Sequence, residues 1–167
     1  MAVLPELLAA NATYADGFAK GNLPMPPGRK VAILTCMDAR IDPAKALGLE
    51  EGDAHVIRNA GGLAAEAIRS LAISQELLGT REIVVIHHTD CGMLTFTDDV
   101  IRERLAESLG PEAGALAAKM EFLPFPDVEE SVRKDLAALK ASRLIRPDTP
   151  IAGFVYDVKT GRLTPVD

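Results

Sequence analysis

Both cysteines of the chain and two of its three histidines lie in two short stretches. Residues 36–40 read Cys-Met-Asp-Ala-Arg, and residues 87–92 read His-His-Thr-Asp-Cys-Gly. Two thiols and an imidazole form a soft ligand set that suits zinc. We therefore expect Cys36, His88 and Cys91 to hold a zinc ion.

The number of ligands favours a catalytic site over a structural one. Structural zinc sites use four protein ligands, whereas catalytic sites use three and keep one position open. The chain has no third cysteine, so the fourth position falls to a water or to a nearby carboxylate. Asp38 is the nearest carboxylate in sequence, and Arg40 can hold it by a two-pronged, charge-assisted hydrogen bond. Asp38 then either accepts a proton from a zinc-bound water or binds the zinc itself, and the residues leave both states open.

The charge of the ligand set predicts a pH dependence. Two thiolates cancel the charge of zinc, whereas a site of three histidines keeps that charge and lowers the pKa of bound water to about 7. The expected site acidifies its water less, so activity should rise toward alkaline pH.

Other polar residues near these motifs have structural explanations. Neighbouring residues of a strand point to opposite faces, so His87 should pack or hydrogen-bond away from a metal that His88 faces. We expect His55 to be structural rather than a proton shuttle, and Asp90 to stabilise the turn between two ligands.

The two stretches follow continuous apolar runs, which are typical of strands buried on both faces. Helical spacing of apolar residues alternates with these runs along the chain. Strands are expected at residues 30–35, 54–58, 82–87 and 150–158, followed by a turn at 160–161 into a short tail. Helices are expected at residues 3–20, 63–78, 94–120 with a break near 110–111, and 127–142, with a helical turn opening at 42–43.

Alternating strands and helices predict an α/β fold with a central, mainly parallel sheet of four or five strands and helices on both faces. We expect the strand order 2-1-3-4, with ligands bound at the carboxyl ends of the strands. Cys36 follows the first strand, and His88 and Cys91 follow the third. The three side chains should therefore meet at one edge of the sheet.

Composition and charge restrict the partners of the protein. The 167 residues suit one domain over residues 1–167, and the net charge of −6 without a basic cluster argues against nucleic acid. Neither a secretory signal nor an apolar run of membrane-spanning length is present, so we expect a cytoplasmic protein that does not bind membranes. The linker at 23–28 sets off an N-terminal helical segment, residues 1–22, which packs on its own domain or on a second subunit.

Three motifs together resemble the beta-class carbonic anhydrases, most of all their compact, archaeal-type branch. The motifs are Cys36-x-Asp38-x-Arg40, Arg58-Asn59-Ala60-Gly61 and His88-Thr89-Asp90-Cys91-Gly92, and the resemblance is close over residues 28–95.

The resemblance implies a zinc hydroxide that attacks carbon dioxide to give bicarbonate and a proton. By matching position, Cys36, His88 and Cys91 are the metal ligands, and Asp38 with Arg40 is the catalytic pair. Gly61 and Gly62 match the loop beside the substrate pocket. The resemblance also implies a homodimer or larger oligomer, in which the N-terminal helix lies across the partner subunit.

Some features depart from the family or leave alternatives open. The chain has no Trp, which some bacterial members use at a second bicarbonate site, and its few aromatic residues predict a pocket lined by aliphatic side chains. A hydrolase of carbonyl sulfide or carbon disulfide could use the same zinc site. A non-catalytic zinc module that binds a protein is a rival of another class, and a thiol redox protein is disfavoured because the chain has no Cys-x-x-Cys motif.

Overall fold

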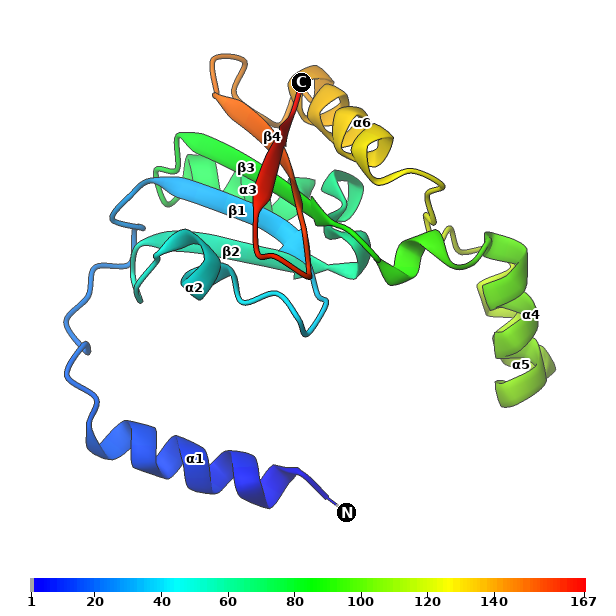
Figure 1. Cartoon of the computed structure of the whole chain (residues 1–167), viewed down its shortest axis with the longest axis horizontal. Coiled ribbons are helices and arrows are strands. Elements are labelled where there is room, and N and C mark those ends of the chain that lie inside the picture. The colour runs from blue at the N-terminus through cyan, green and yellow to red at the C-terminus, as the bar shows by residue number, and fades with distance from the viewer. Residues whose placement is uncertain (1) are drawn as a thin grey trace.

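The fold is organised around one five-stranded sheet in the order β2-β1-β3-β4-β5 (Figure 1). The computed structural model describes residues 2–167. Strands β1 to β4 are parallel, and β5 runs antiparallel to β4. The predicted α/β class and the 2-1-3-4 order are confirmed. The strands are β1 (Val31–Cys36), β2 (Ala54–Asn59), β3 (Glu82–His88), β4 (Ile151–Tyr156) and β5 (Leu163–Val166).

Helices surround the sheet. Helix α3 lies behind the sheet and α2 in front of it in Figure 1. The α-helices are α1 (Leu4–Asp16), α2 (Pro43–Leu47), α3 (Ile68–Glu76), α4 (Asp98–Leu109), α5 (Pro111–Ala117) and α6 (Val128–Ala141). Three short 3₁₀ turns complete the set, η1 (Ala60–Gly62), η2 (Ala64–Glu66) and η3 (Gly92–Leu94).

The main core lies between the two central strands and helices α3 and α6. Leu34 of β1 and Val85 of β3 are fully buried there against Leu71 of α3 and Leu139 of α6. Burying a side chain of this size contributes about 1.5–3 kcal/mol. This packing fixes β1 and β3 side by side, and their carboxyl ends carry the predicted ligands.

The helix predicted over residues 63–78 begins later, at Ile68. Gly61 and Gly62 have φ values of 82° and 76°, which a right-handed helix cannot contain. The Asn59 side chain then holds Leu63 in an extended conformation, because Oδ1 accepts from the Leu63 N–H at 2.7 Å and Nδ2 donates to the Leu63 carbonyl at 2.9 Å. The segment therefore approaches the end of β1 before it turns into α3.

The short tail expected after residue 161 is wrong, because residues 163–166 form strand β5 at one edge of the sheet. Asp157 closes the preceding turn by accepting from the backbone N–H groups of Lys159 and Thr160 at 2.7 and 3.0 Å. The sequence signal is weak because β5 is four residues long and contains Pro165. The opposite edge of the sheet is β2, where Val56 is exposed.

Helix α1 stands away from the sheet, and the α4–α5 hairpin projects on another side (Figure 1). No residue of α1 is buried within the described part of the chain. Polar contacts near its end join it to the body, since Tyr14 donates to Glu51 at 3.1 Å and Lys20 pairs with Glu51 at 2.6 Å. Each of several apolar side chains in this segment is more than half exposed, namely Val3, Leu4, Leu7 and Leu8.

Candidate active site

The three predicted ligands converge at the carboxyl edge of the sheet. Cys36 is the last residue of β1, His88 is the last residue of β3, and Cys91 follows one turn later. Because β1 and β3 are parallel neighbours, both strand ends lie at the same edge. The two sulfur atoms and a ring nitrogen of His88 lie within 4.8 Å of one another, and all three residues are buried.

The orientation of the His88 ring fits a metal ligand. Nδ1 donates a hydrogen bond to the Thr89 carbonyl at 2.9 Å, which leaves Nε2 as the nitrogen with a free lone pair. Nε2 is buried and has no hydrogen-bond partner among the described residues. A buried polar atom without a partner is costly unless something else satisfies it. A zinc ion held with two thiolates would satisfy it, so these residues fit the metal.

The two thiols differ in acidity. The adjacent Cys91 thiol, and to a lesser degree the adjacent His88 ring, hold the pKa of the Cys36 thiol below its usual range, although burial opposes the shift. The neighbouring Cys36 sulfur, together with burial, raises the pKa of Cys91. Cys36 is therefore the first of the two thiols to ionise, and a bound metal would hold both as thiolates.

Asp38 and Arg40 form the predicted two-pronged pair. Nε and Nη2 of Arg40 donate to Oδ1 and Oδ2 of Asp38 at 2.9 and 2.8 Å, and the Arg40 backbone N–H donates to Oδ1 at 2.8 Å. These hydrogen bonds hold the pKa of Asp38 well below its usual range. The carboxylate is therefore ionised and lies beside the ligand cluster, with Oδ2 at 3.8 Å from Nε2 of His88.

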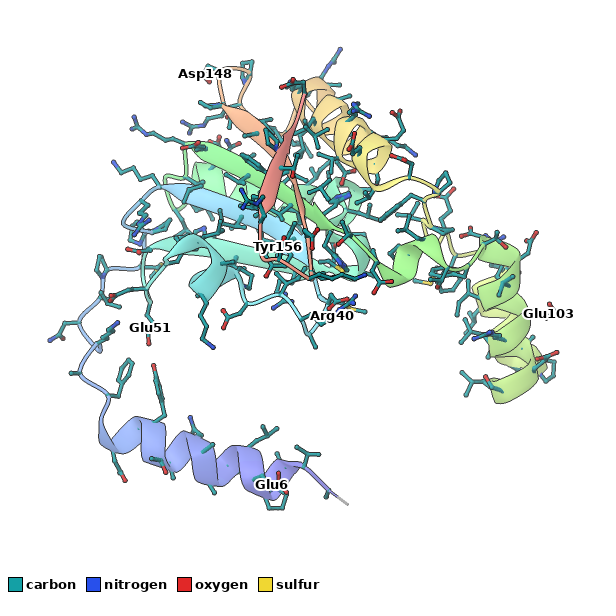
Figure 2. All side chains as sticks on the ribbon, viewed as in Figure 1. Glu6, Arg40, Glu51, Glu103, Asp148 and Tyr156 are labelled. Atoms are coloured by element: carbon teal, nitrogen blue, oxygen red, sulfur yellow. The ribbon has the colours of Figure 1, made fainter. Side chains whose placement is uncertain are left out.

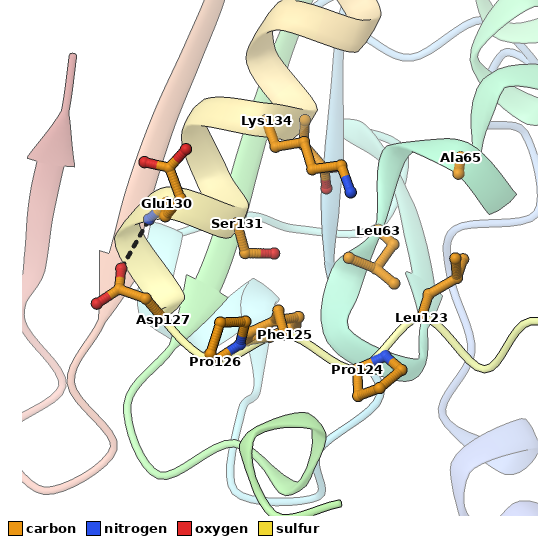
Figure 3. Close-up of a pocket in the computed structure, with 11 residues that line it drawn as sticks. Leu63, Ala65, Leu123, Pro124, Phe125, Pro126, Asp127, Glu130, Ser131 and Lys134 are labelled. Atoms are coloured by element: carbon orange, nitrogen blue, oxygen red, sulfur yellow. Dashed lines mark hydrogen bonds between the residues drawn. The ribbon is translucent and has the colours of Figure 1, made fainter. Parts of the chain in front are cut away.

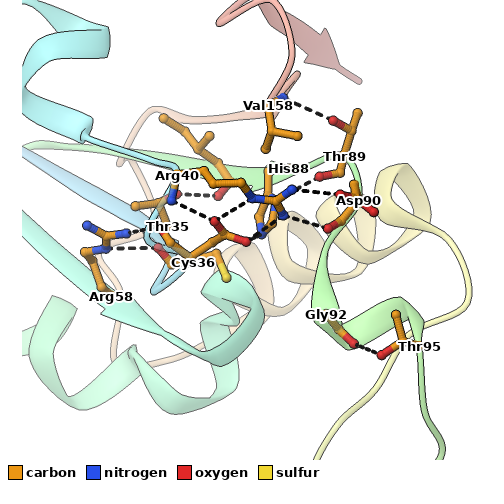
Figure 4. Close-up of polar contacts among 12 residues, drawn as sticks. Thr35, Cys36, Arg40, Arg58, His88, Thr89, Asp90, Gly92, Thr95 and Val158 are labelled. Atoms are coloured by element: carbon orange, nitrogen blue, oxygen red, sulfur yellow. Dashed lines mark hydrogen bonds and ion pairs between the residues drawn. The ribbon is translucent and has the colours of Figure 1, made fainter. Parts of the chain in front are cut away.

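Two further residues fix the ligand loops, and the sequence did not reveal their roles. Asp90 pairs with Arg40, whose Nη1 donates to Oδ2 at 2.7 Å and whose Nη2 donates to the Asp90 carbonyl at 2.8 Å (Figure 4). Arg58 of β2 donates from Nε to the Cys36 carbonyl at 2.9 Å and from Nη2 to the Asp38 carbonyl at 2.7 Å. The sequence signals were the position of Asp90 in the turn between two ligands and the place of Arg58 in the motif at residues 58–61, and neither indicated these partners.

A cavity of about 280 Å³ opens beside the cluster. Its size suits a small linear molecule and its wall is mostly apolar. Met37, Ala60 and Met93 supply aliphatic side chains, as expected from the sequence, and Phe96 adds one aromatic ring. Gly61 lines the cavity, whereas Gly62 packs on β1, where an added Cβ would lie 2.8 Å from the Cys36 nitrogen. The lining residues are Cys36, Met37, Asp38, Ala60, Gly61, Cys91, Gly92, Met93 and Phe96.

Comparison with known proteins identifies the family. A family model described as carbonic anhydrase matches residues 31–163. The beta-carbonic anhydrase 1 of Mycobacterium tuberculosis (strain H37Rv) is 48% identical over 167 residues, which is 99% of each chain. The chain belongs to the beta-carbonic anhydrase family. Members of this family are zinc enzymes.

Structural similarity agrees with this assignment to the beta-carbonic anhydrases. The solved structure of a carbonic anhydrase from Glaciozyma antarctica has a TM-score of 0.96 and 53% sequence identity, with 100% of both chains covered. A related branch of the beta-carbonic anhydrases acts on another molecule. The carbon disulfide hydrolase of Acidianus sp. (strain A1-3) is 35% identical over 170 residues, covering 90% of this chain and 82% of the relative.

The other two histidines of this beta-carbonic anhydrase lie away from the cluster. As predicted, His87 faces the opposite side, where Nε2 contacts Oδ2 of Asp135 at 3.1 Å and the ring stacks on Phe125 at 5.6 Å. Asp135 and Phe125 border a second cavity of about 350 Å³ (Figure 3). His55 contacts Ser74 at 2.7 Å and lies level with Ala32, four residues before Cys36, so it does not reach the cluster.

Among residues 2–167, no helix combines the length and the apolar character that crossing a bilayer requires.

Proposed function

We propose that this protein catalyses the reversible hydration of carbon dioxide to bicarbonate and a proton, with a zinc ion held by Cys36, His88 and Cys91. One arrangement carries the proposal. Three buried soft ligands lie within 4.8 Å of one another. An ionised carboxylate, held by Arg40, lies beside them at the wall of a small apolar cavity.

The chain and the metal divide the chemistry between them. Zinc, when bound, supplies the Lewis acidity that makes a water molecule nucleophilic toward carbon dioxide. Asp38 would accept a hydrogen bond from a water at the cluster and direct its lone pair toward the cavity, while Arg40 keeps Asp38 ionised and in place. The apolar wall formed by Met93 and Phe96 accommodates an uncharged linear substrate.

The ligand set also determines how the rate depends on pH. Two thiolate ligands would offset the charge of the metal, so a water at the site would be acidified less than at a site of three histidines. Arg40 restores part of the positive field near the cluster. We expect hydration to become faster toward alkaline pH.

The main alternative is hydrolysis of carbon disulfide or carbonyl sulfide at the same site. A relative named carbon disulfide hydrolase supports it at 35% identity, whereas relatives named carbonic anhydrase reach 48% and 53%. A non-catalytic zinc module has no use for an ionised Asp38 beside the cluster. Carbon dioxide is therefore the substrate that the similarities favour.

Stopped-flow hydration of carbon dioxide, measured on zinc-assayed protein over a pH series, tests the proposal. We expect a rate that follows zinc content and increases with pH. A second series with carbon disulfide and carbonyl sulfide is run on the same preparation. Bound zinc without hydration at alkaline pH would refute the carbon dioxide assignment, and turnover of a sulfur substrate would then replace it.

We also propose that residues 1–167 form one zinc-binding domain that self-associates through its N-terminal segment, residues 1–22. The exposed apolar face of α1 supports this, because Leu4, Leu7 and Leu8 remain open to solvent in a single chain. Multi-angle light scattering tests it. L7E/L8E should shift the protein toward the monomer, whereas Leu144→Glu, at an exposed leucine outside this segment, should not.

We also propose a cytoplasmic location, which the two ligand cysteines support. Cys36 and Cys91 are free thiols, and a reducing compartment keeps such thiols available to a metal. Cell fractionation tests this location, and recovery of the protein outside the cytoplasm would contradict it.

A further inference from the structure

We propose that Asp90 is a positioning residue for the hydration reaction: it anchors Arg40 so that Arg40 holds the Asp38 carboxylate beside the ligand cluster instead of letting it join the cluster. This inference rests on the proposed function. It adds Asp90 to the pair of Asp38 and Arg40. Hydrogen bonds among these three residues then join the loop after Cys36 to the loop between His88 and Cys91.

Arg40 is held by hydrogen bonds on two sides. Its guanidinium has five N–H donors. Two of them hold Asp38, and two others hold the Oδ2 and the backbone carbonyl of Asp90. The Arg40 side chain is 45% exposed, so burial does little to fix it. Asp90 therefore supplies the second fixed point that sets the plane of the guanidinium.

The backbone of Asp90 has an uncommon conformation. Asp90 has a φ of 53°, one of three residues other than glycine with positive φ in the described chain. This left-handed conformation is uncommon for residues with a Cβ, although Asp and Asn tolerate it. It belongs to the same residue that presents both a carboxylate and a carbonyl to Arg40, and this residue lies between the ligands His88 and Cys91. Arg40 is thus tied directly to the second ligand loop.

The position of Asp38 shows why this anchor matters. Asp38 Oδ2 is 3.8 Å from the free ring nitrogen of His88, so a small displacement would bring it into the ligand cluster. A carboxylate that joined the cluster would occupy the position that the attacking water needs. An Arg40 fixed at Asp90 opposes that displacement.

Asp90→Gly tests the proposal because glycine keeps the left-handed turn and removes only the carboxylate. Asp90→Asn keeps the turn and a neutral acceptor. Glu76→Gln is the matched control, since it removes the carboxylate partner of Arg146, which precedes β4 at the other end of the strands. Each variant is examined for hydration rate and, after cobalt substitution, for the absorption bands that report the number of protein ligands.

We expect Asp90→Gly to reduce kcat by about three- to tenfold and to shift the cobalt spectrum toward four protein ligands. Asp90→Asn should show a smaller loss of rate and a smaller spectral shift. Glu76→Gln should change neither the rate nor the spectrum. In an Asp38→Asn background, Asp90→Gly should have almost no further effect, because Asp90 acts through Asp38. An unchanged rate and spectrum, or an equal loss in both backgrounds, would overturn the proposal.

The two proposals fail in different ways. A wild-type protein that binds zinc without hydrating carbon dioxide would refute the proposed function, while the cobalt spectra would still test Asp90. An active wild type with an unaltered Asp90→Gly variant would refute only the role of Asp90. If Asp90→Gly does not fold, the rate and the cobalt spectrum of Asp90→Asn are compared with those of the wild type, and the expected changes are smaller.

Discussion

Oδ2 of Asp38 lies 3.8 Å from Nε2 of His88, too far for a hydrogen bond but beside the nitrogen that would bind the metal. Three hydrogen bonds from Arg40 hold the carboxylate in this position. Asp38 is therefore placed to orient a water at the ligand cluster while remaining ionised.

Replacing Asp38 by Asn should lower kcat for hydration by about a hundredfold, a usual cost when a reacting group is no longer held in the right orientation. The zinc content should stay unchanged, because Cys36, His88 and Cys91 are retained. Stopped-flow rates and metal analysis measure both quantities. Asp148→Asn, at a distant carboxylate (Figure 2), is the control, and a full rate in Asp38→Asn would refute the orienting role.

Gly62→Ala should destabilise the protein far more than Gly79→Ala. The two glycines have nearly equal φ values of 76° and 74°, but an added Cβ meets the Cys36 nitrogen at 2.8 Å only at Gly62 and meets nothing within 4 Å at Gly79. Backbone strain alone costs about 1–2 kcal/mol. Urea unfolding should show a loss of this size in the free energy of unfolding for Gly79→Ala and at least twice that loss for Gly62→Ala. Equal losses would show that the loop around Gly62 shifts to accommodate the added Cβ.

Asp135→Ala should reduce thermal stability. The buried Asp135 carboxylate accepts from the Ala64 N–H at 2.9 Å and contacts His87 at 3.1 Å. Leaving both groups without a partner costs about 2 kcal/mol, which corresponds to about 4–8 °C in Tm for a chain of this size. Scanning calorimetry measures the change. Asp127→Ala, which removes only the cap of α6, should cost about half as much, and a larger effect there would contradict this ranking.

Arg40→Gln should make chelator-treated protein unfold at higher pH during acid titration. Hydrogen bonds from Arg40 lower the pKa of both Asp38 and Asp90 in the folded state. A lowered folded pKa stabilises the native state above the ordinary Asp pKa of about 3.9, and this contribution disappears as pH falls through the folded value. Circular dichroism measures the midpoint. Arg133→Gln, on the exposed pairs of α6, is the control, and identical midpoints for wild type and Arg40→Gln would contradict the expectation.

The sequence predicted the features that depend on local pattern and strand alternation. The apolar runs located β1 and β3, and the rule that parallel strands end at one edge brought Cys36 and Cys91 together. The contact of Arg40 with Asp90 was missed because it joins residues fifty positions apart, and their juxtaposition depends on side-chain directions that no periodicity encodes. Likewise, β5 was missed because its stability comes from pairing with β4 and not from its own composition.

The two edges of the sheet have unequal consequences for aggregation. β5 is short and contains Pro165, which has no N–H with which to bind another strand, whereas β2 has six residues and no proline. An added strand from another molecule can therefore pair well only along β2. Under heat or partial unfolding, such pairing joins two chains through their β2 edges and leaves a β5 edge at each end. Growth into long fibrils is disfavoured by this geometry, so paired chains are the expected end point of edge-to-edge misassembly.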